Sequence, residues 1–137
     1  MERGGSGEES DSNRAGLVAV VDDDVSVLRS LRNLLASVRL RVEVFDSAEA
    51  FLESSHVAET RCLLLDLRMP GMSGTELFSL LIASGYRIRI VVLTAATDGD
   101  EMERLLRQGA VAVLTKPFRS ADVLRAVYDA LRTADRR

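Results

Sequence analysis

The sequence has 137 residues, 47% hydrophobic and 28% charged, which suits one domain with a single core. Its 18 basic and 21 acidic residues give a formal net charge of -3, which excludes a broadly basic surface for nucleic acid or anionic membranes. One cysteine and one histidine exclude an internal disulfide and a zinc site built from these ligands.

The first segment, 1–16, consists almost entirely of small and polar side chains. Such a segment cannot bury enough apolar surface to offset its ordering entropy, so we expect a disordered tail followed by one domain over 17–134. The segment does not resemble a signal peptide, and no later apolar run approaches the roughly 18 residues of a membrane span. We therefore expect a cytoplasmic protein without membrane contact.

Five short apolar runs recur after the tail. Most are continuous in Val, Leu and Ile, which is typical of strands buried on both faces of a parallel sheet. The runs cover 17–21, 42–45, 62–65, 90–93 and 110–114.

The segments between the runs show helical spacing of apolar residues. Asp46 with Glu49 three residues later resembles a capping box at a helix start, and Ser120 suits another start. Gly85 and Gly109 stand where helices would end. The alternation predicts an α/β fold, a doubly wound five-stranded parallel sheet with right-handed crossovers.

Polar residues follow the runs at the predicted strand ends. Ligands bind at the carboxyl ends of the strands in such sheets, so this edge is the candidate site. Any single acid after the first run could simply cap the next helix, but that does not explain the acid after the third. The residues are Asp22, Asp23, Asp24, Asp66, Thr94, Thr115 and Lys116.

Three of these carboxylates, Asp22, Asp23 and Asp66, are expected close together. Like charges about 5 Å apart repel by roughly 3 kcal/mol at an effective dielectric of about 20, so the cluster needs a counter-charge. Oxygen-only ligands suit Mg²⁺, which accepts one or two carboxylates and keeps several waters. We therefore expect a magnesium site.

Lys116 is the only lysine among the 18 basic residues. A compact ammonium on a flexible stem differs from the planar guanidinium used at the other 17 positions. Its position at a strand end favours contact with a phosphoryl oxygen over an ordinary exposed residue before a turn.

These motifs resemble the receiver domain of two-component response regulators. They span nearly all of the chain after the tail, in the right order and spacing. The resemblance implies a flavodoxin-like sheet in the order 2-1-3-4-5 with five helices. The matching tracts are VVDDD at 20–24, LLLDLRMPGMSG at 63–74, VVLTA at 91–95 and GAVAVLTKPF at 109–118.

The resemblance also implies the metal ligands. Asp66 would be the phosphoacceptor, and Asp23 and Asp66 would bind Mg²⁺ directly. Asp22 would act largely through water, and the backbone carbonyl of Arg68 would complete the protein ligands.

The phosphoryl contacts follow from the same resemblance. Thr94 and Lys116 would contact the phosphoryl group, and the Lys116–Pro117 peptide would be cis. Arg68 and Ala96 occupy positions that tune dephosphorylation in the family.

The implied reaction is phosphoryl transfer from the phosphohistidine of a sensor histidine kinase to Asp66, followed by slow self-catalysed hydrolysis. The domain would be a switch rather than an enzyme with a separate substrate. The tract DLRMPGMSG resembles receivers of helix-turn-helix transcriptional regulators, so transcription is the expected output, with no direct nucleic-acid contact from this domain. The chain stops at Arg137, so it is either a single-domain regulator or a receiver from something longer.

Val113 departs from the family pattern. Many members carry an aromatic residue three positions before the lysine, which swings inward with the threonine. Valine has no ring to relocate, so we expect signalling through the loop and helix after Thr94, and homodimerisation through the fourth helix and fifth strand.

Other functions remain open from the residues alone. The acids at Asp22 and Asp24 with Thr94 and Lys116 also resemble a haloacid-dehalogenase-type phosphatase with Asp22 as nucleophile, although no acidic pair ends a later strand. A pseudo-receiver that only binds a partner is disfavoured because every matched site residue is present. Flavodoxin-like cofactor binding is disfavoured because the first loop is acidic where a phosphate needs amides and hydroxyls.

Overall fold

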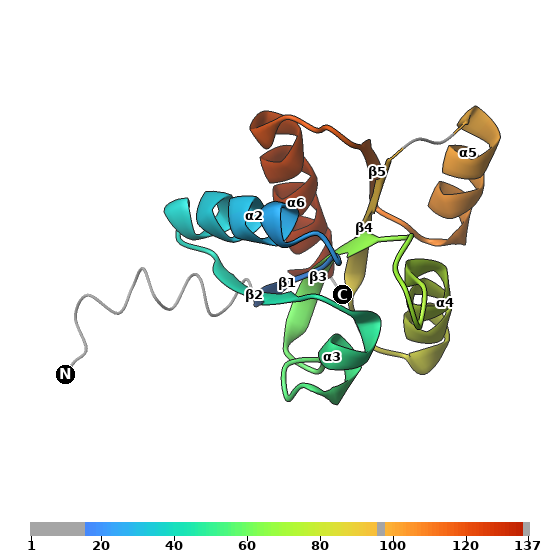
Figure 1. The fold of residues 1–137 in the computed structure, drawn as a ribbon, viewed down its shortest axis with the longest axis horizontal. Helices are drawn as coiled ribbons and strands as arrows, with labels where there is room; N and C mark the ends of the chain where they lie inside the picture. Colours follow the sequence, from blue (N-terminus) through green and yellow to red (C-terminus); the bar gives the residue numbers. More distant parts are fainter. Residues whose placement is uncertain (1–15, 96–97, 136–137) are drawn as a thin grey trace.

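The computed structural model describes residues 16–95 and 98–135. Within these residues five strands alternate with five helices (Figure 1). The predicted tail lies outside the described residues except for Gly16. The elements are β1 (Leu17–Val21), α2 (Val25–Ser37), β2 (Arg41–Phe45), α3 (Ala48–Glu53), β3 (Thr60–Asp66), α4 (Gly74–Ser84), β4 (Arg89–Thr94), α5 (Gly99–Gln108), β5 (Ala112–Thr115) and α6 (Ser120–Asp135).

The strands form one parallel sheet in the order β2-β1-β3-β4-β5, which confirms the predicted fold. The chain moves outward from β1 to β2, then crosses back to β3 on the other side of β1. The strand order therefore reverses between β1 and β3, and their carboxyl ends form the crevice where such sheets bind ligands.

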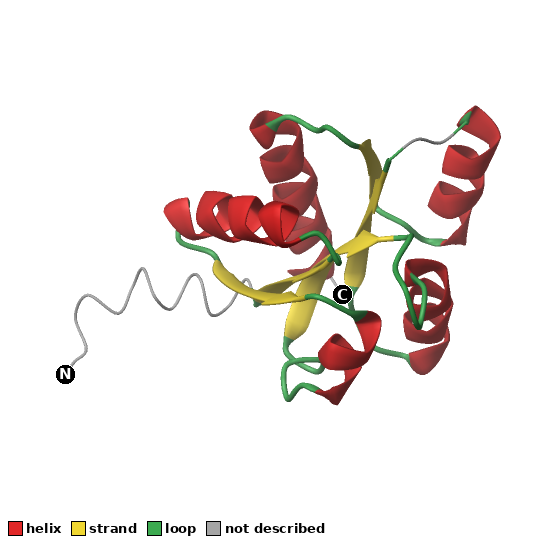
Figure 2. Ribbon diagram, in the orientation of Figure 1, coloured by secondary structure: helices red, strands yellow, loops and turns green. Residues whose placement is uncertain are grey.

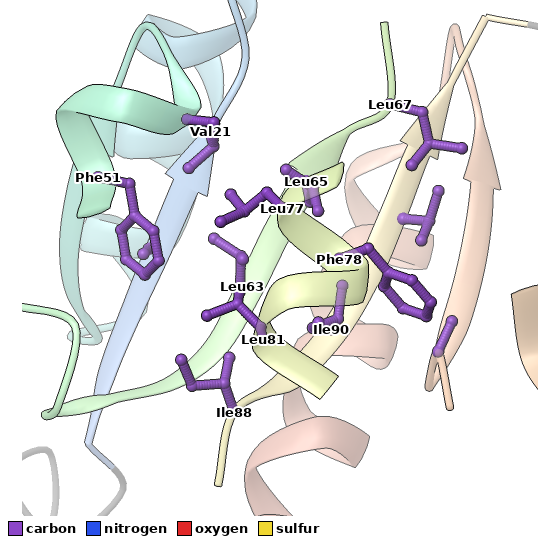
Figure 3. Packing of buried hydrophobic residues seen from close by; sticks show 14 of the residues in the cluster. Val21, Phe51, Leu63, Leu65, Leu67, Leu77, Phe78, Leu81, Ile88 and Ile90 are labelled. Atoms are coloured by element: carbon purple, nitrogen blue, oxygen red, sulfur yellow. The ribbon is translucent and has the colours of Figure 1, made fainter. Parts of the chain in front are cut away.

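Helices cover both faces of the sheet (Figure 2). Successive strand residues point to opposite faces, so Val18 and Val20 pack under α2 and α6, whereas Ala19 and Val21 pack under α3 and α4. The core on the α3 and α4 side of the sheet is built around Phe51 and around leucines and isoleucines of β3, α4 and β4 (Figure 3).

Burial explains why the central strands have continuous apolar runs. All five residues of β1 are buried, as are six of the seven residues of β3. The edge strand β2 is only half-buried and carries Arg41 and Glu43 among its apolar residues. The last apolar run starts before its strand, because Ala110 N still bonds to Leu105 O at the end of α5.

Most predicted helix boundaries are confirmed. Gly85 and Gly109 end α4 and α5 with positive φ angles of 87° and 122°, which glycine adopts at little steric cost. α6 starts at Ser120. None of the described helices combines the length and apolar character needed to cross a bilayer.

The predicted capping box at Asp46 and Glu49 is wrong. The N-cap of α3 is Ser47, whose Oγ accepts a hydrogen bond from Ala50 N at 3.0 Å. The helix begins one residue later than predicted, so the third helical position is Ala50, which has no polar side chain to complete the box. Glu49 is left to bond elsewhere.

Candidate functional site

The sheet register brings the predicted site residues to one edge. Val21 pairs with Leu65, so Asp22 and Asp66 directly follow paired residues on β1 and β3. On the other side of β3, Thr94 ends β4, and its backbone oxygen accepts a hydrogen bond from Lys116 N at 2.7 Å. Four segments of the chain thus meet at the carboxyl edge.

Three carboxylates form a cluster at this edge. One oxygen each from Asp22, Asp23 and Asp66 lies within 4.8 Å of the others. Asp22 is fully buried and Asp66 is only 5% exposed, whereas Asp23 faces solvent. With Lys116 the four side chains carry a net charge of -2 when ionised, and hard oxygen donors at this spacing fit a divalent cation such as Mg²⁺.

The ammonium of Lys116 is the counter-charge within the chain. Its Nζ lies 2.8 Å from Asp22 Oδ2 and 3.7 Å from Asp66 Oδ2. Partial burial lowers the pKa of Lys116, but the hydrogen bond and charge of Asp22, together with the charge of Asp66, raise it more, so the net shift is upward. Lys116 therefore stays protonated within the acidic cluster.

Asp66 is held in an environment that disfavours its charged form. Its pKa is raised above the usual value by burial, and the charges of Asp22 and Asp23 add to this effect. A hydrogen bond from Arg68 N to Asp66 Oδ1 at 3.2 Å and the charge of Lys116 oppose the shift without cancelling it. A cation bound beside this carboxylate would stabilise its charged form and lower its pKa.

Asp24 does not join the cluster. It is the N-cap of α2, and its Oδ1 accepts hydrogen bonds from Ser26 N at 2.9 Å and Ser26 Oγ at 2.7 Å. These bonds, the Ser26 hydroxyl first, lower the pKa of Asp24. Of the three consecutive acids, Asp22 and Asp23 belong to the carboxylate cluster, whereas Asp24 caps α2.

The loop between Asp66 and α4 is anchored close to the site. Leu67 N bonds to Leu93 O at 3.3 Å, and Gly74 N bonds to Leu67 O at 3.0 Å. A β-carbon on Gly74 would collide with the backbone oxygen of Asp66, so only glycine lets α4 begin this close to the end of β3.

Glu49 is a residue that sequence reasoning missed. Its Oε2 accepts a hydrogen bond from Met72 N at 2.8 Å, 23 residues along the chain. This bond, together with the amide of Glu49 itself, lowers the pKa of the Glu49 carboxyl. The sequence carries no signal for the contact, because it depends on how α3 and the loop meet in space.

A groove opens beside Lys116, between α2 and the start of α6. Its volume is about 510 Å³, and it is lined by side chains that include Asp24, Leu34 and Phe118. Since Lys116 also lines it, the groove leaves the lysine side of the site accessible from solvent.

Other expected positions are placed as follows. Thr94 is buried, with 2% exposure, and the Lys116–Pro117 peptide is cis, as the resemblance implies. Val113 is half-buried against the core, and Ala96 lies outside the described residues. Cys62 is fully buried in β3.

The single histidine, His56, is partly buried. It precedes β3, at the amino ends of the strands and so opposite the acidic cluster, and its side chain is 30% exposed. Its Nδ1 lies 2.9 Å from Glu59 Oε2, and its ring lies against Phe45 with 6.4 Å between centroids. The residue therefore packs within the fold, away from the site.

Comparison with known proteins matches the chain to the family that its sequence motifs resemble. A family model described as the response regulator receiver domain matches residues 18–128. The nodulation protein W of Bradyrhizobium diazoefficiens is 40% identical over 126 residues, covering 92% of this chain and 56% of that protein. The transcriptional regulatory protein TdiR of Thauera aromatica is 38% identical over 120 residues, covering 88% of this chain and 53% of TdiR.

Solved structures show the same fold. The response regulator StyR superposes with a TM-score of 0.79 at 45% identity, covering 86% of this chain and 60% of StyR. A receiver protein from Burkholderia phymatum gives a TM-score of 0.74 at 35% identity, covering 85% and 95% of the two chains. The present chain thus spans little more than half the length of the curated relatives it matches.

The phosphatase alternative is not supported by these matches, because the family model is that of the response regulator receiver domain and StyR is a response regulator. Its proposed nucleophile is also poorly placed. Asp22 is fully buried, and its two oxygens already accept hydrogen bonds from Lys116 Nζ at 2.8 Å and Asp24 N at 2.9 Å.

Proposed function

The chain belongs to the response regulator receiver family of two-component signalling, and from this premise we propose that Asp66 accepts a phosphoryl group within a magnesium-dependent site. The observation that carries this proposal is the meeting of three carboxylates within 4.8 Å and one ammonium at the sheet's switch point. Every residue that the family resemblance requires there, among those the structure describes, lies at this edge.

The metal ligands we propose are those implied by the resemblance. Asp23 and Asp66 would hold the ion directly, Asp22 would act largely through water, and Arg68 would contribute its backbone carbonyl. Both oxygens of Asp22 already accept hydrogen bonds, which supports the indirect role. A bound Mg²⁺ would neutralise charge on the phosphoryl oxygens.

The chain's own groups then carry out the transfer. An oxygen of Asp66 attacks the phosphorus of a phosphohistidine; the new P–O bond forms as the P–N bond breaks, and the electron pair stays on the imidazole nitrogen. Lys116, 3.7 Å from Asp66 Oδ2, is close enough to bind an equatorial phosphoryl oxygen with its ammonium. Hydrolysis reverses the attachment: water attacks phosphorus, releasing phosphate and restoring the carboxylate.

The relatives support the partner and the output that we propose. We propose a sensor histidine kinase as the phosphoryl donor. Relatives such as TdiR are named as transcriptional regulators, and we propose transcription control as the output of the present protein too. The domain at 17–134 and the cytoplasmic location stay predictions.

The switch that we propose runs from Thr94 into α5. Phosphorylation places about two negative charges where Asp66 had one, and the Thr94 hydroxyl would reorient onto the new group. A homodimer through α5 and β5 would pass the signal on, and Leu106 on α5 is 43% exposed at this surface. Sedimentation with and without a phosphoryl mimic tests the dimer, and an unchanged monomer would contradict it.

Intact-mass measurement tests the phosphoacceptor. The protein is incubated with acetyl phosphate and Mg²⁺, and the wild type is expected to gain the mass of one phosphoryl group. Asp66→Asn is expected to gain none, while Asp24→Asn serves as the control because Asp24 caps a helix outside the cluster. An adduct of equal amount on Asp66→Asn would contradict the proposal.

A further inference from the structure

The loop that follows Asp66 is tied to a distant helix by one side chain. Glu49, in the first turn of α3, accepts a hydrogen bond from Met72 N at 2.8 Å. In the described part of the chain, the only other side chain from outside the loop and α4 that hydrogen-bonds to the backbone of residues 67–73 is that of Asp66, which accepts from Arg68 N.

The loop backbone is shaped for this contact. Gly71 has a φ of 74°, in the left-handed region that glycine adopts readily. A β-carbon at Gly71 would lie 2.8 Å from Glu49 Oε2, so the carboxylate lies directly against the loop backbone. The turn at Gly71 presents the following amide, that of Met72, to Glu49.

The hydrogen bond between Met72 and Glu49 lies in the same loop as a residue that contacts Asp66. The same loop contains Arg68, whose amide bonds to Asp66 Oδ1 and whose carbonyl is an expected metal ligand. The first loop residue is fixed to β4 through Leu67 N and Leu93 O, and the last is fixed by the capping box of Ser73 and Glu76. Between these anchors, the hydrogen bond from Met72 to Glu49 holds the middle of the loop.

We infer that Glu49 is a positioning residue for the phosphorylation site, which fixes the 67–73 loop so that the Arg68 backbone and the Asp66 carboxylate are preorganised for the metal. This inference rests on the proposed function. Glu49 touches neither the metal nor the phosphoryl group in this role; it acts through Met72 and the loop.

Three variants of the full chain separate this role from a general effect on folding. Glu49→Ala removes the acceptor. Glu49→Gln keeps an amide oxygen that can accept the same bond. Glu53→Ala is the matched control, because Glu53 ends the same helix, is exposed, and its side chain forms no hydrogen bond or ion pair among the described residues.

Two measurements report on the loop and the metal. Isothermal titration calorimetry gives the dissociation constant for Mg²⁺, and hydrogen exchange by NMR gives the protection of the Met72 amide. For Glu49→Ala we expect Mg²⁺ binding to weaken by about threefold to tenfold, the scale of the net contribution of one ordinary hydrogen bond, with faster exchange at Met72. Glu49→Gln and Glu53→Ala should stay within about twofold of the wild type.

The outcomes distinguish the two proposals. If the wild type binds Mg²⁺ and Glu49→Ala binds it equally tightly, the inference about Glu49 is wrong and the proposed function stands. If Glu49→Ala lowers the urea unfolding free energy without changing Mg²⁺ affinity, the role is structural and the inference is again wrong. If the wild type neither binds Mg²⁺ nor accepts a phosphoryl group, the proposed function fails and the inference fails with it.

Discussion

The ammonium of Lys116 hydrogen-bonds the fully buried carboxylate of Asp22 at 2.8 Å, across 94 residues of sequence. The same ammonium is 3.7 Å from Asp66. The lysine therefore pairs most closely with the more deeply buried of the two acids. The pair joins the end of β1 to the loop after β5, so the site also ties the sheet together.

Removing the lysine should destabilise the metal-free fold. Lys116→Met leaves the charge of Asp22 buried without its partner, and we expect a loss of about 2 kcal/mol in the free energy of unfolding, since Lys116 is partly exposed. Urea denaturation in the presence of a chelator measures it. Adding Asp22→Asn to Lys116→Met should recover part of the loss; a double variant that loses the sum of the two single effects would show that the residues are not coupled.

Magnesium should stabilise the folded chain. At a concentration about ten times its dissociation constant, a ligand of the native state adds about 1.4 kcal/mol to the free energy of unfolding. Asp23→Asn should abolish most of this gain with little effect on the metal-free protein, because Asp23 is exposed. Glu103→Gln on α5 is the control. Equal stabilisation of wild type and Asp23→Asn would rule out Asp23 as a ligand.

Asp66 should give the metal-free fold a distinct pH dependence. Its pKa is raised in the folded state, chiefly by burial, so the native protein holds this proton more tightly than the unfolded chain. The contribution to stability is fully present below the unfolded pKa and is lost as pH rises through the folded pKa. Asp66→Asn should therefore be more stable than the wild type at neutral pH without Mg²⁺.

The same comparison at acid pH supplies the control. As pH falls toward the ordinary range of aspartate, the wild-type carboxyl becomes protonated and the advantage of Asp66→Asn should shrink. Urea unfolding at several pH values, with a chelator present, measures the free energy of unfolding of the wild type and of Asp66→Asn. An Asp66→Asn protein that is less stable than the wild type at neutral pH would contradict the assigned environment.

Cys62 should be chemically inert in the native protein. Burial raises the pKa of its thiol to about 12 from 9.0, a difference of about three units, so the reactive thiolate is rarer by a factor on the order of 1000. Labelling by an aromatic disulfide reagent at mildly alkaline pH should be slow in buffer and fast in urea. Comparable rates in the two solvents would show that the central strand is open to solvent.

The fold was predictable because its signals are local or depend on burial. Continuous apolar runs marked the strands since β1 and β3 are covered on both faces, and glycine marked the ends of α4 and α5. The start of α3 was missed because Asp46 and Ser47 are both good N-cap residues and only the backbone decides between them.

The site was predictable to the level of which residues meet. Asp22 and Lys116 follow a strand, Asp66 and Thr94 are the last residues of one, and parallel strands end at one edge. The preference of Lys116 for Asp22 over Asp66 depends on side-chain reach across the sheet, which no spacing in the sequence encodes.

Peptide mapping of the phosphorylated protein tests the central claim most directly, because it shows which aspartate carries the phosphoryl group. After brief incubation with acetyl phosphate and Mg²⁺, tandem mass spectrometry should place the added group on Asp66 in the segment 63–74, with Asp22 unmodified. A phosphoryl group found on Asp22, or on a residue outside the cluster with Asp66 bare, would contradict the assignment of Asp66 as the phosphoacceptor.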